Sequence, residues 1–252
     1  LRGLWLTRKR RMRIASTLTA LGMILLVATS EANEPRPYEA IYQAKALGMS
    51  ATATRRQSIS DEQQYTLENS LSLTVLGANV GSVTETSEYV WNDSQIVPLH
   101  YRYVQTGIGA NSEEIFFDWN NALAISQSDE ESWEVALNEG VLDKLSFSVQ
   151  IGQDIAKRGL TEFNYNIVDE DKIDEHLYSI STEEVLNTPL GQLNTIKIER
   201  VRATESRRRT TVWLAKDWDY LLVRLEQVSS SGTETQLSLE SATMAGSPVT
   251  GL

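Results

Sequence analysis

The stretch TEFNYNIV, Thr161 to Val168, decides the fold class because apolar and polar side chains alternate along it. Phe163, Tyr165 and Ile167 fall on one side of an extended chain, and polar residues fall on the other. One apolar and one polar face is typical of a strand in an antiparallel sheet that is solvated on one side. The stretch therefore predicts a β-strand.

The same alternation recurs along the chain, whereas helical periodicity is scarce. It is clear in PYEAIYQAKA (37–46) and in NTIKIERVR (194–202), and short polar or glycine-bearing connections separate the stretches. Further stretches are 49–58, 62–75, 80–91, 96–106, 113–119, 122–127, 132–137, 172–185, 206–215, 220–228 and 233–240. We predict an all-β, mainly antiparallel fold, in which a curved meander sheet forms a flattened or incomplete β-barrel.

The segment KDWD, Lys216 to Asp219, places a base beside two acids between two apolar segments. A strand ending near Ala215 and another starting near Tyr220 leave about four residues, which is an ordinary hairpin loop length. Aspartate favours turns because its carboxylate can bond nearby backbone amides. We therefore predict a turn here and not a catalytic cluster.

One segment, NEGVLDKLSFSVQIGQDIAKRG (138–159), departs from the alternation. Its apolar residues, among them Leu142, Leu145 and Val149, recur at helical spacing and predict an amphipathic helix over about 141–157. A single amphipathic helix in an all-β chain has to bury its apolar stripe against the sheet. We expect it to cover the concave face or the open end of the incomplete barrel.

The N-terminus resembles a secretory signal peptide. A basic cluster at 8–13 precedes the apolar run 14–28, and Ser30-Glu31-Ala32 places small residues at the positions that signal peptidase requires. We predict a signal peptide over 1–32 that is cleaved near Ala32, and hence a periplasmic product. The alternative is an uncleaved anchor, although the apolar run is shorter than the roughly 20 residues of a spanning helix.

The sequence predicts a single domain between an N-terminal signal peptide and a C-terminal tail. Met12 offers an internal start, in which case residues 1–11 would not be translated. Residues 33–241 are long enough to form a single β-rich domain. The segment 242–252 is rich in small and polar residues and is expected to be a disordered tail.

Charge and cysteine content narrow the choice of partners. Removal of residues 1–32 leaves 17 Lys+Arg against 33 Asp+Glu, a net charge of −16. Such a charge argues against nucleic acid as a partner. The chain has no cysteine, so neither a disulfide nor a lipidated cysteine is expected, and no transmembrane span is expected in the mature chain.

Candidates for catalysis and metal binding are weak. His176 follows two acids, but a single histidine with adjacent carboxylates gives no fixed metal geometry. The acidic run 169–175 lacks the glycine and the ligand positions of a calcium loop. Neighbouring carboxylates such as Glu113-Glu114 and Glu183-Glu184 face opposite ways on a strand and do not converge. We predict no metal, no cofactor and no catalytic residue, which leaves enzymatic activity uncertain.

Two other groups could form binding sites. The basic clusters Arg55-Arg56 and 207–209 could hold a phosphate or a lipid head group, although cross-strand ion pairing is the simpler interpretation. Aromatic residues on predicted strands could fill a core or line an apolar cavity. The predicted ligand-lining set is Tyr101, Tyr103, Trp119, Phe163, Tyr165 and Trp213.

The order of several short motifs resembles the exported bacterial family catalogued as domain of unknown function 3108. The motifs are Tyr38–Tyr42, Val97–Leu99 with Tyr101, Phe117–Trp119, Gly140 to Ser146, Asn187–Gly191 and Trp213 to Arg224. The resemblance implies a periplasmic, antiparallel, barrel-like protein with no established activity. It draws attention to Asp143 and Ser146, whose structural role would be to hold the first turn of the helix. Leu222 stands where the family tends to have proline, which leaves edge placement of that strand open.

Three functions remain open on this basis. The first is a non-enzymatic binding protein that holds a lipid-like or other hydrophobic small molecule in a barrel cavity. The second is a structural or assembly factor of the cell envelope that binds another envelope protein. The third is a hydrolase of an envelope polymer that uses dispersed carboxylates.

Overall fold

A computed structural model describes residues 34–46, 48–75, 78–107, 109–157 and 160–252. The predicted signal peptide over 1–32, with its cleavage site near Ala32, lies outside the described residues. All described residues belong to one unit that spans residues 32–252.

Strands dominate this unit, and they follow one another as hairpins. The first eight are β1 (Tyr38–Ala46), β2 (Met49–Ile59), β3 (Gln64–Val75), β4 (Ala78–Asn92), β5 (Gln95–Gly107), β6 (Asn111–Asp118), β7 (Leu123–Ser128) and β8 (Glu131–Ala136). After β9 (Val141–Leu142) and the helix α1 (Phe147–Ala156) come β10 (Glu162–Asp169), β11 (Lys172–Thr188), β12 (Gly191–Arg200), β13 (Arg209–Ala215), β14 (Leu221–Val228), β15 (Glu234–Met244) and β16 (Ser247–Pro248).

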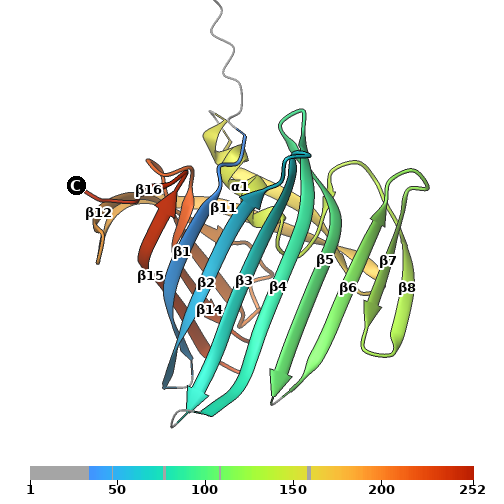
Figure 1. Cartoon of the computed structure of the whole chain (residues 1–252), viewed down its shortest axis with the longest axis horizontal. Helices are drawn as coiled ribbons and strands as arrows, with labels where there is room; N and C mark the ends of the chain where they lie inside the picture. The colour runs from blue at the N-terminus through green and yellow to red at the C-terminus, as the bar shows by residue number, and fades with distance from the viewer. Residues whose placement is uncertain (1–33, 47, 76–77, 108, 158–159) are drawn as a thin grey trace, which may run out of the picture. The chain divides into compact units, whose positions relative to one another are not determined.

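These strands form one sheet whose order is β8-β7-β6-β5-β4-β3-β2-β1-β15-β14-β13-β12-β11-β10-β9, with β16 beside β15. Strands β1 to β8 run side by side in Figure 1. Every pair is antiparallel except β9 with β10, which is parallel. The sheet is not closed by hydrogen bonds, because β8 and β9 end the order, although β9 also lies against β5. The prediction of an all-β, incomplete barrel is confirmed.

Side-chain burial follows the alternation in the sequence. In β10, Phe163, Tyr165 and Ile167 are buried while the residues between them are exposed. In β1, Ala40, Tyr42 and Ala44 are buried in the same way. These two strands therefore turn one apolar face towards the interior, as their period of two requires.

The buried side chains form two clusters. The larger contains Tyr65, Tyr101, Ile115 and Ile167, and α1 packs on it through Ile151. The smaller joins β1, β13, β14 and β15 with residues near the C-terminus.

The helix is present but begins later than the sequence predicts. Val141 and Leu142 form β9, and helical geometry starts only at Phe147. Leu142 and Leu145 are buried as the apolar pattern requires, but they lie in the strand and in the turn before the helix. A short strand and a turn can thus reproduce the apolar spacing of one more helical turn.

The segment KDWD is a turn, as predicted. Residues 216–220 connect β13 to β14, and the backbone N–H of Tyr220 donates to the carbonyl of Ala215 at 2.9 Å. Asp219 and Tyr220 adopt positive φ angles of 48° and 56°. Strand β14 pairs with both β13 and β15, so Leu222 lies in an interior strand and not at an edge.

The C-terminal segment differs from the disorder expected for 242–252. Strand β15 continues to Met244, β16 follows, and Val249 is buried in the smaller cluster. The backbone N–H of Gly251 donates to the carbonyl of Leu190 at 2.7 Å. The few apolar side chains of this segment have a place in the core, and its backbone hydrogen-bonds to the turn between β11 and β12. This order was not evident from composition.

Candidate ligand-binding cavity

A cavity of about 710 Å³ lies inside the curve of the sheet. Residues of β1 to β4 line one side, residues of β10 to β15 line another, and α1 contributes Phe147–Val149 and Ile151–Gln153. The interior of the incomplete barrel is therefore not packed solid, and its volume falls in the range of about 300–1,000 Å³ that is typical of small-molecule sites.

Strands β13 and β14 supply an apolar part of the cavity wall. Val212 pairs with Leu225, and Leu214 pairs with Leu222, so each pair lies on the same face of the sheet. All four side chains line the cavity. Trp213, between Val212 and Leu214, faces the other way, because successive side chains on a strand point to opposite faces.

A half-buried group of polar side chains around Arg55 lines another part of the cavity. The Arg55 Nε–H donates to the hydroxyl of Tyr38 at 2.7 Å, and its guanidinium also donates to Asn69 and to Ser148 of α1. Glu85 accepts from the Asn69 amide at 3.0 Å. Burial raises the pKa of Glu85, although its hydrogen bonds and the nearby Arg55 oppose that shift.

Three further arginines, Arg200, Arg202 and Arg208, also line the cavity. None of them forms an ion pair with any residue in the described part of the chain. Burial lowers the pKa of Arg202, and the positive charges of Arg200 and Arg208 lower it further. These arginines therefore form a region of uncompensated positive charge.

His176 lines the cavity as well. Burial lowers the pKa of His176 to about 4, and the nearby Arg200 contributes in the same direction. Its ring is neutral at neutral pH, and its Nδ1 is buried without a hydrogen-bond partner among the described residues. The edge of Phe147 packs against the ring, with 6.0 Å between centroids.

Most acidic side chains that line the cavity are already paired. Asp169 forms an ion pair with Lys144, and Asp219 forms one with Arg36. The carboxylate of Asp174 lies 3.2 Å from the ammonium of Lys172. The charges that remain without an ion pair in the lining are therefore mainly those of arginines.

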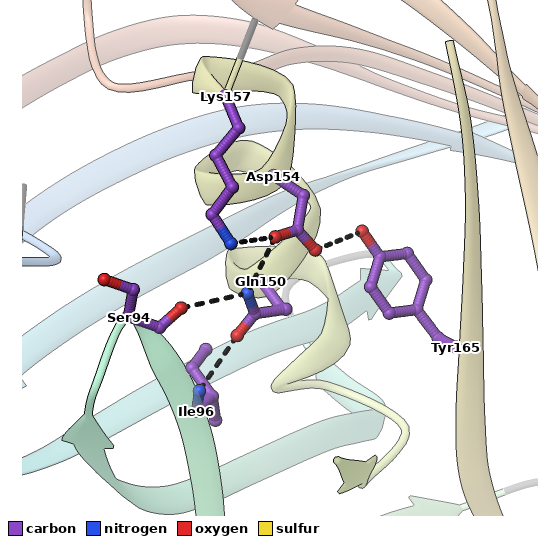
Figure 2. A network of polar contacts seen from close by, with 6 residues as sticks. All are labelled: Ser94, Ile96, Gln150, Asp154, Lys157 and Tyr165. Carbon is purple, nitrogen blue, oxygen red and sulfur yellow. Dashed lines mark hydrogen bonds and ion pairs between the residues drawn. The ribbon is translucent and has the colours of Figure 1, made fainter. Parts of the chain in front are cut away.

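The helix α1 is fixed over the sheet by side-chain hydrogen bonds, which Figure 2 shows. The Gln150 side-chain oxygen accepts from the backbone N–H of Ile96 in β5 at 2.8 Å, and its amide donates to Asp154 at 3.1 Å. The hydroxyl of Tyr165 in β10 donates to the other oxygen of Asp154 at 3.0 Å. These bonds link β5 to β10 through the helix, where the sheet itself has no closing ladder.

Asp143 and Ser146 hold the turn that starts the helix. The Oδ1 of the fully buried Asp143 accepts from the backbone N–H groups of Leu145 and Ser146, each at 2.7 Å. Its Oδ2 accepts from the hydroxyl of Ser87 in β4 at 2.6 Å, and the Ser146 hydroxyl accepts from the Asp143 N–H at 3.2 Å. Burial raises the pKa of Asp143 against these hydrogen bonds.

The six aromatic residues that the sequence suggests as ligand-lining are all absent from the lining of this cavity. Tyr101, Phe163 and Tyr165 are buried in the larger core cluster, and Tyr103 and Trp119 pack against that cluster. They fill the core, the other role that the sequence allowed for them.

Trp213 belongs to the smaller core cluster, and its indole N–H donates to Glu184 at 2.6 Å. The cations of Lys197 and Arg224 lie over its ring, at 5.5 and 5.6 Å from the centroid.

In each of the two basic clusters, one arginine lines the cavity and its neighbour does not. Arg55 and Arg208 line the cavity, whereas their neighbours Arg56 and Arg207 are exposed and do not. Sequence reasoning overlooked Arg200 and Arg202. A signal was present, because they continue the alternation of Ile196 and Ile198, so an apolar strand face ends in two cations.

The carboxylates and histidines of the described residues do not gather into a metal site. No group of three or more His, Asp or Glu residues in the described part of the chain could hold a metal ion. Glu113 forms an ion pair with Lys144, whereas Glu114 bonds the His100 ring at 2.8 Å, so the two neighbours diverge. No helix among the residues described is both long and apolar enough to cross a membrane.

Comparison with solved structures supports the fold. The chain is similar to a β-barrel-like protein of domain of unknown function DUF1849 from Brucella abortus, with a TM-score of 0.54 and 9% identity over 83% of this chain and 98% of that one. It also aligns with a protein from Parabacteroides distasonis that is provisionally described as a lipoprotein, with a TM-score of only 0.31 and 11% identity over 83% and 96% of the two chains.

No curated protein matches the sequence. The model of one family, described as "Protein of unknown function (DUF3108)", matches residues 38–239, which is most of the chain. The protein therefore belongs to the DUF3108 family.

Proposed function

We propose that this protein is a non-enzymatic binding protein of the periplasm, which holds a lipid-like or other hydrophobic envelope component inside its barrel-like sheet. The observation that carries the proposal is the cavity of about 710 Å³. Val212, Leu214, Leu222 and Leu225 supply apolar surface, and burying such surface favours binding by about 25 cal/mol per Å². The periplasmic location rests on the signal peptide that the sequence predicts over residues 1–32.

Polar side chains that line the cavity, and the helix beside it, are held in place by hydrogen bonds. Arg55 is fixed by three neutral side chains, and α1 is fixed to β5 and β10 by Gln150 and Asp154. Small-molecule sites combine apolar surface with polar groups that are held in fixed orientations. The hydrogen-bonded positions of Arg55 and α1 beside the apolar wall support a binding function.

Native mass spectrometry of the full chain, purified from the periplasm of an expressing cell, tests the proposal. We expect a co-purifying hydrophobic mass on the wild-type protein. The substitution Val212→Phe should reduce its occupancy at least several-fold, because the larger side chain enters the cavity. The matched control is Thr211→Phe, since Thr211 lies on the other face of the same strand and does not line the cavity.

Thermal unfolding of both variants after removal of bound lipid separates loss of binding from loss of fold. The proposal would be overturned if the wild-type protein carried no co-purifying small molecule in any preparation and bound no added hydrophobic probe. A stoichiometric protein mass in place of a small molecule would indicate an assembly factor instead.

A further inference from the structure

The arginines that line the cavity differ in how well their charges are satisfied. Arg55 has three hydrogen-bond partners and lies near Glu85. Arg202 has a single hydrogen bond, from its Nη2 to the hydroxyl of Thr210 at 3.2 Å, while its Nη1 is buried with no partner among the described residues. A buried guanidinium nitrogen without a hydrogen-bond partner costs free energy. A ligand group that accepted a hydrogen bond from Arg202 would remove this cost.

The residues around Arg202 add positive charge and a second polar atom without a partner among the described residues. Arg200 and Arg208 line the same cavity without ion pairs within the described segments, and their repulsion lowers the pKa of Arg202. The buried Nδ1 of His176 is a second polar atom without a partner there. An acidic group placed among these side chains would relieve the repulsion and accept the unused guanidinium hydrogens, which suit carboxylate and phosphate geometry.

The wall beside these arginines changes from polar to apolar along strands β13 and β14. Thr210, which bonds Arg202, pairs with Gln227. The next pairs on the same face are Val212 with Leu225 and then Leu214 with Leu222. A molecule whose acidic group lay at Arg202 could therefore extend an apolar chain along these two pairs.

We propose that the ligand is an amphiphile with one acidic head group, carboxylate or phosphate, which is bound by Arg200, Arg202 and Arg208 while its apolar chain lies against β13 and β14. This inference rests on the proposed function, because it names the chemical class of the molecule that the cavity holds.

The test uses the full-length exported protein after its endogenous lipid has been removed. Titration calorimetry compares four probes: a single-chain fatty acid, the primary alcohol of the same chain length, the corresponding alkyl phosphate, and inorganic phosphate. We expect at least one acidic amphiphile to bind about 10- to 100-fold more tightly than the alcohol, the ratio that a charge-assisted hydrogen bond provides. Inorganic phosphate should bind much more weakly than that amphiphile.

Variants assign the preference to the arginines. Arg202→Gln should reduce affinity for the acid to near that of the alcohol, and thermal unfolding shows whether the variant is folded. If Arg202→Gln does not fold, Arg208→Gln at an exposed position should give the same selective loss. The matched control is Arg207→Gln, an exposed arginine outside the cavity lining, which should change neither affinity.

The outcomes separate this inference from the proposed function. Equal binding of alcohol and acids would overturn the inference and leave the hydrophobic binding protein intact. Phosphate that binds as tightly as the acidic amphiphiles would also overturn it, because the site would then recognise a free anion. Absence of binding by all probes would contradict both.

Discussion

The charge state of His176 should depend on folding at mildly acidic pH. Its pKa falls from the ordinary 6.5 to about 4, because burial and the charges of Arg200 and Arg202 outweigh the attraction of Asp174 and Asp169. Between these two values the unfolded chain binds a proton that the folded chain does not. The contribution of neutral His176 is therefore fully present above pH 6.5 and is lost as the pH falls towards 4.

We expect this loss to be about 1–2 kcal/mol between pH 7.5 and 4.5, after allowance for the partial exposure of the ring. Urea unfolding of the wild-type protein and of His176→Gln at both pH values measures it. The variant should lose less stability on acidification by that amount. Buried carboxyls with raised pKa values, Glu85, Glu113 and Asp143, act in the opposite direction but equally in both proteins, so the difference isolates His176. If the free energy of unfolding changed equally with pH in the two proteins, the pH dependence would not come from His176.

At the scale of single elements, the helix α1 replaces the hydrogen bonds that would close a complete barrel. Gln150→Leu keeps most of the side-chain volume but removes the acceptor for the buried N–H of Ile96. A buried donor without a partner costs about 1–3 kcal/mol, so we expect the free energy of unfolding to fall by that amount. Hydrogen exchange should become faster at the Ile96 amide in particular.

Gln153→Leu is the matched control for that substitution, because Gln153 lies on the same helix, lines the cavity and forms no side-chain hydrogen bond among the residues described. It should leave the Ile96 amide as protected as in the wild-type protein. Equal destabilisation by the two substitutions would show that α1 does not depend on this contact.

The sequence predicted the strands better than the ends of the elements. Alternation is a local property of each strand, so the buried faces of β1 and β10 were readable directly. The start of α1 was not, because the buried carboxylate of Asp143 holds the chain in a turn and also accepts a hydrogen bond from Ser87 on the distant strand β4. The order of the C-terminal segment likewise depends on a distant partner, the turn at Leu190.

The binding residues were harder to predict than the strands. Periodicity indicates which side chains share a face, but it does not indicate which inward faces meet closely and which leave a space. Tyr101 and Tyr165 were thus plausible as cavity residues and are core residues. The alternation put Arg200 and Arg202 on one face, but it did not indicate that this face lines a cavity.

At the scale of the whole molecule, an open sheet leaves an edge that could pair with another copy. Strand β8 ends the sheet order, and it carries the exposed acids Glu131 and Glu134. Charges on an edge strand oppose pairing because a second edge would bring like charges together and desolvate them. We therefore expect the double substitution Glu131→Val and Glu134→Val to cause concentration-dependent association, measured by light scattering after size-exclusion chromatography.

The control for that experiment is Glu226→Val, because Glu226 is an exposed acid on β14, which has hydrogen-bonded strands on both sides. This substitution removes a charge and adds an apolar side chain away from the sheet edges. The variant should therefore keep the association state of the wild-type protein. Association of the Glu226 variant as strongly as the β8 variant would mean that surface apolarity, and not the open edge, drives self-pairing. A double variant of β8 that stays in the wild-type state at high concentration would mean that another feature protects this edge.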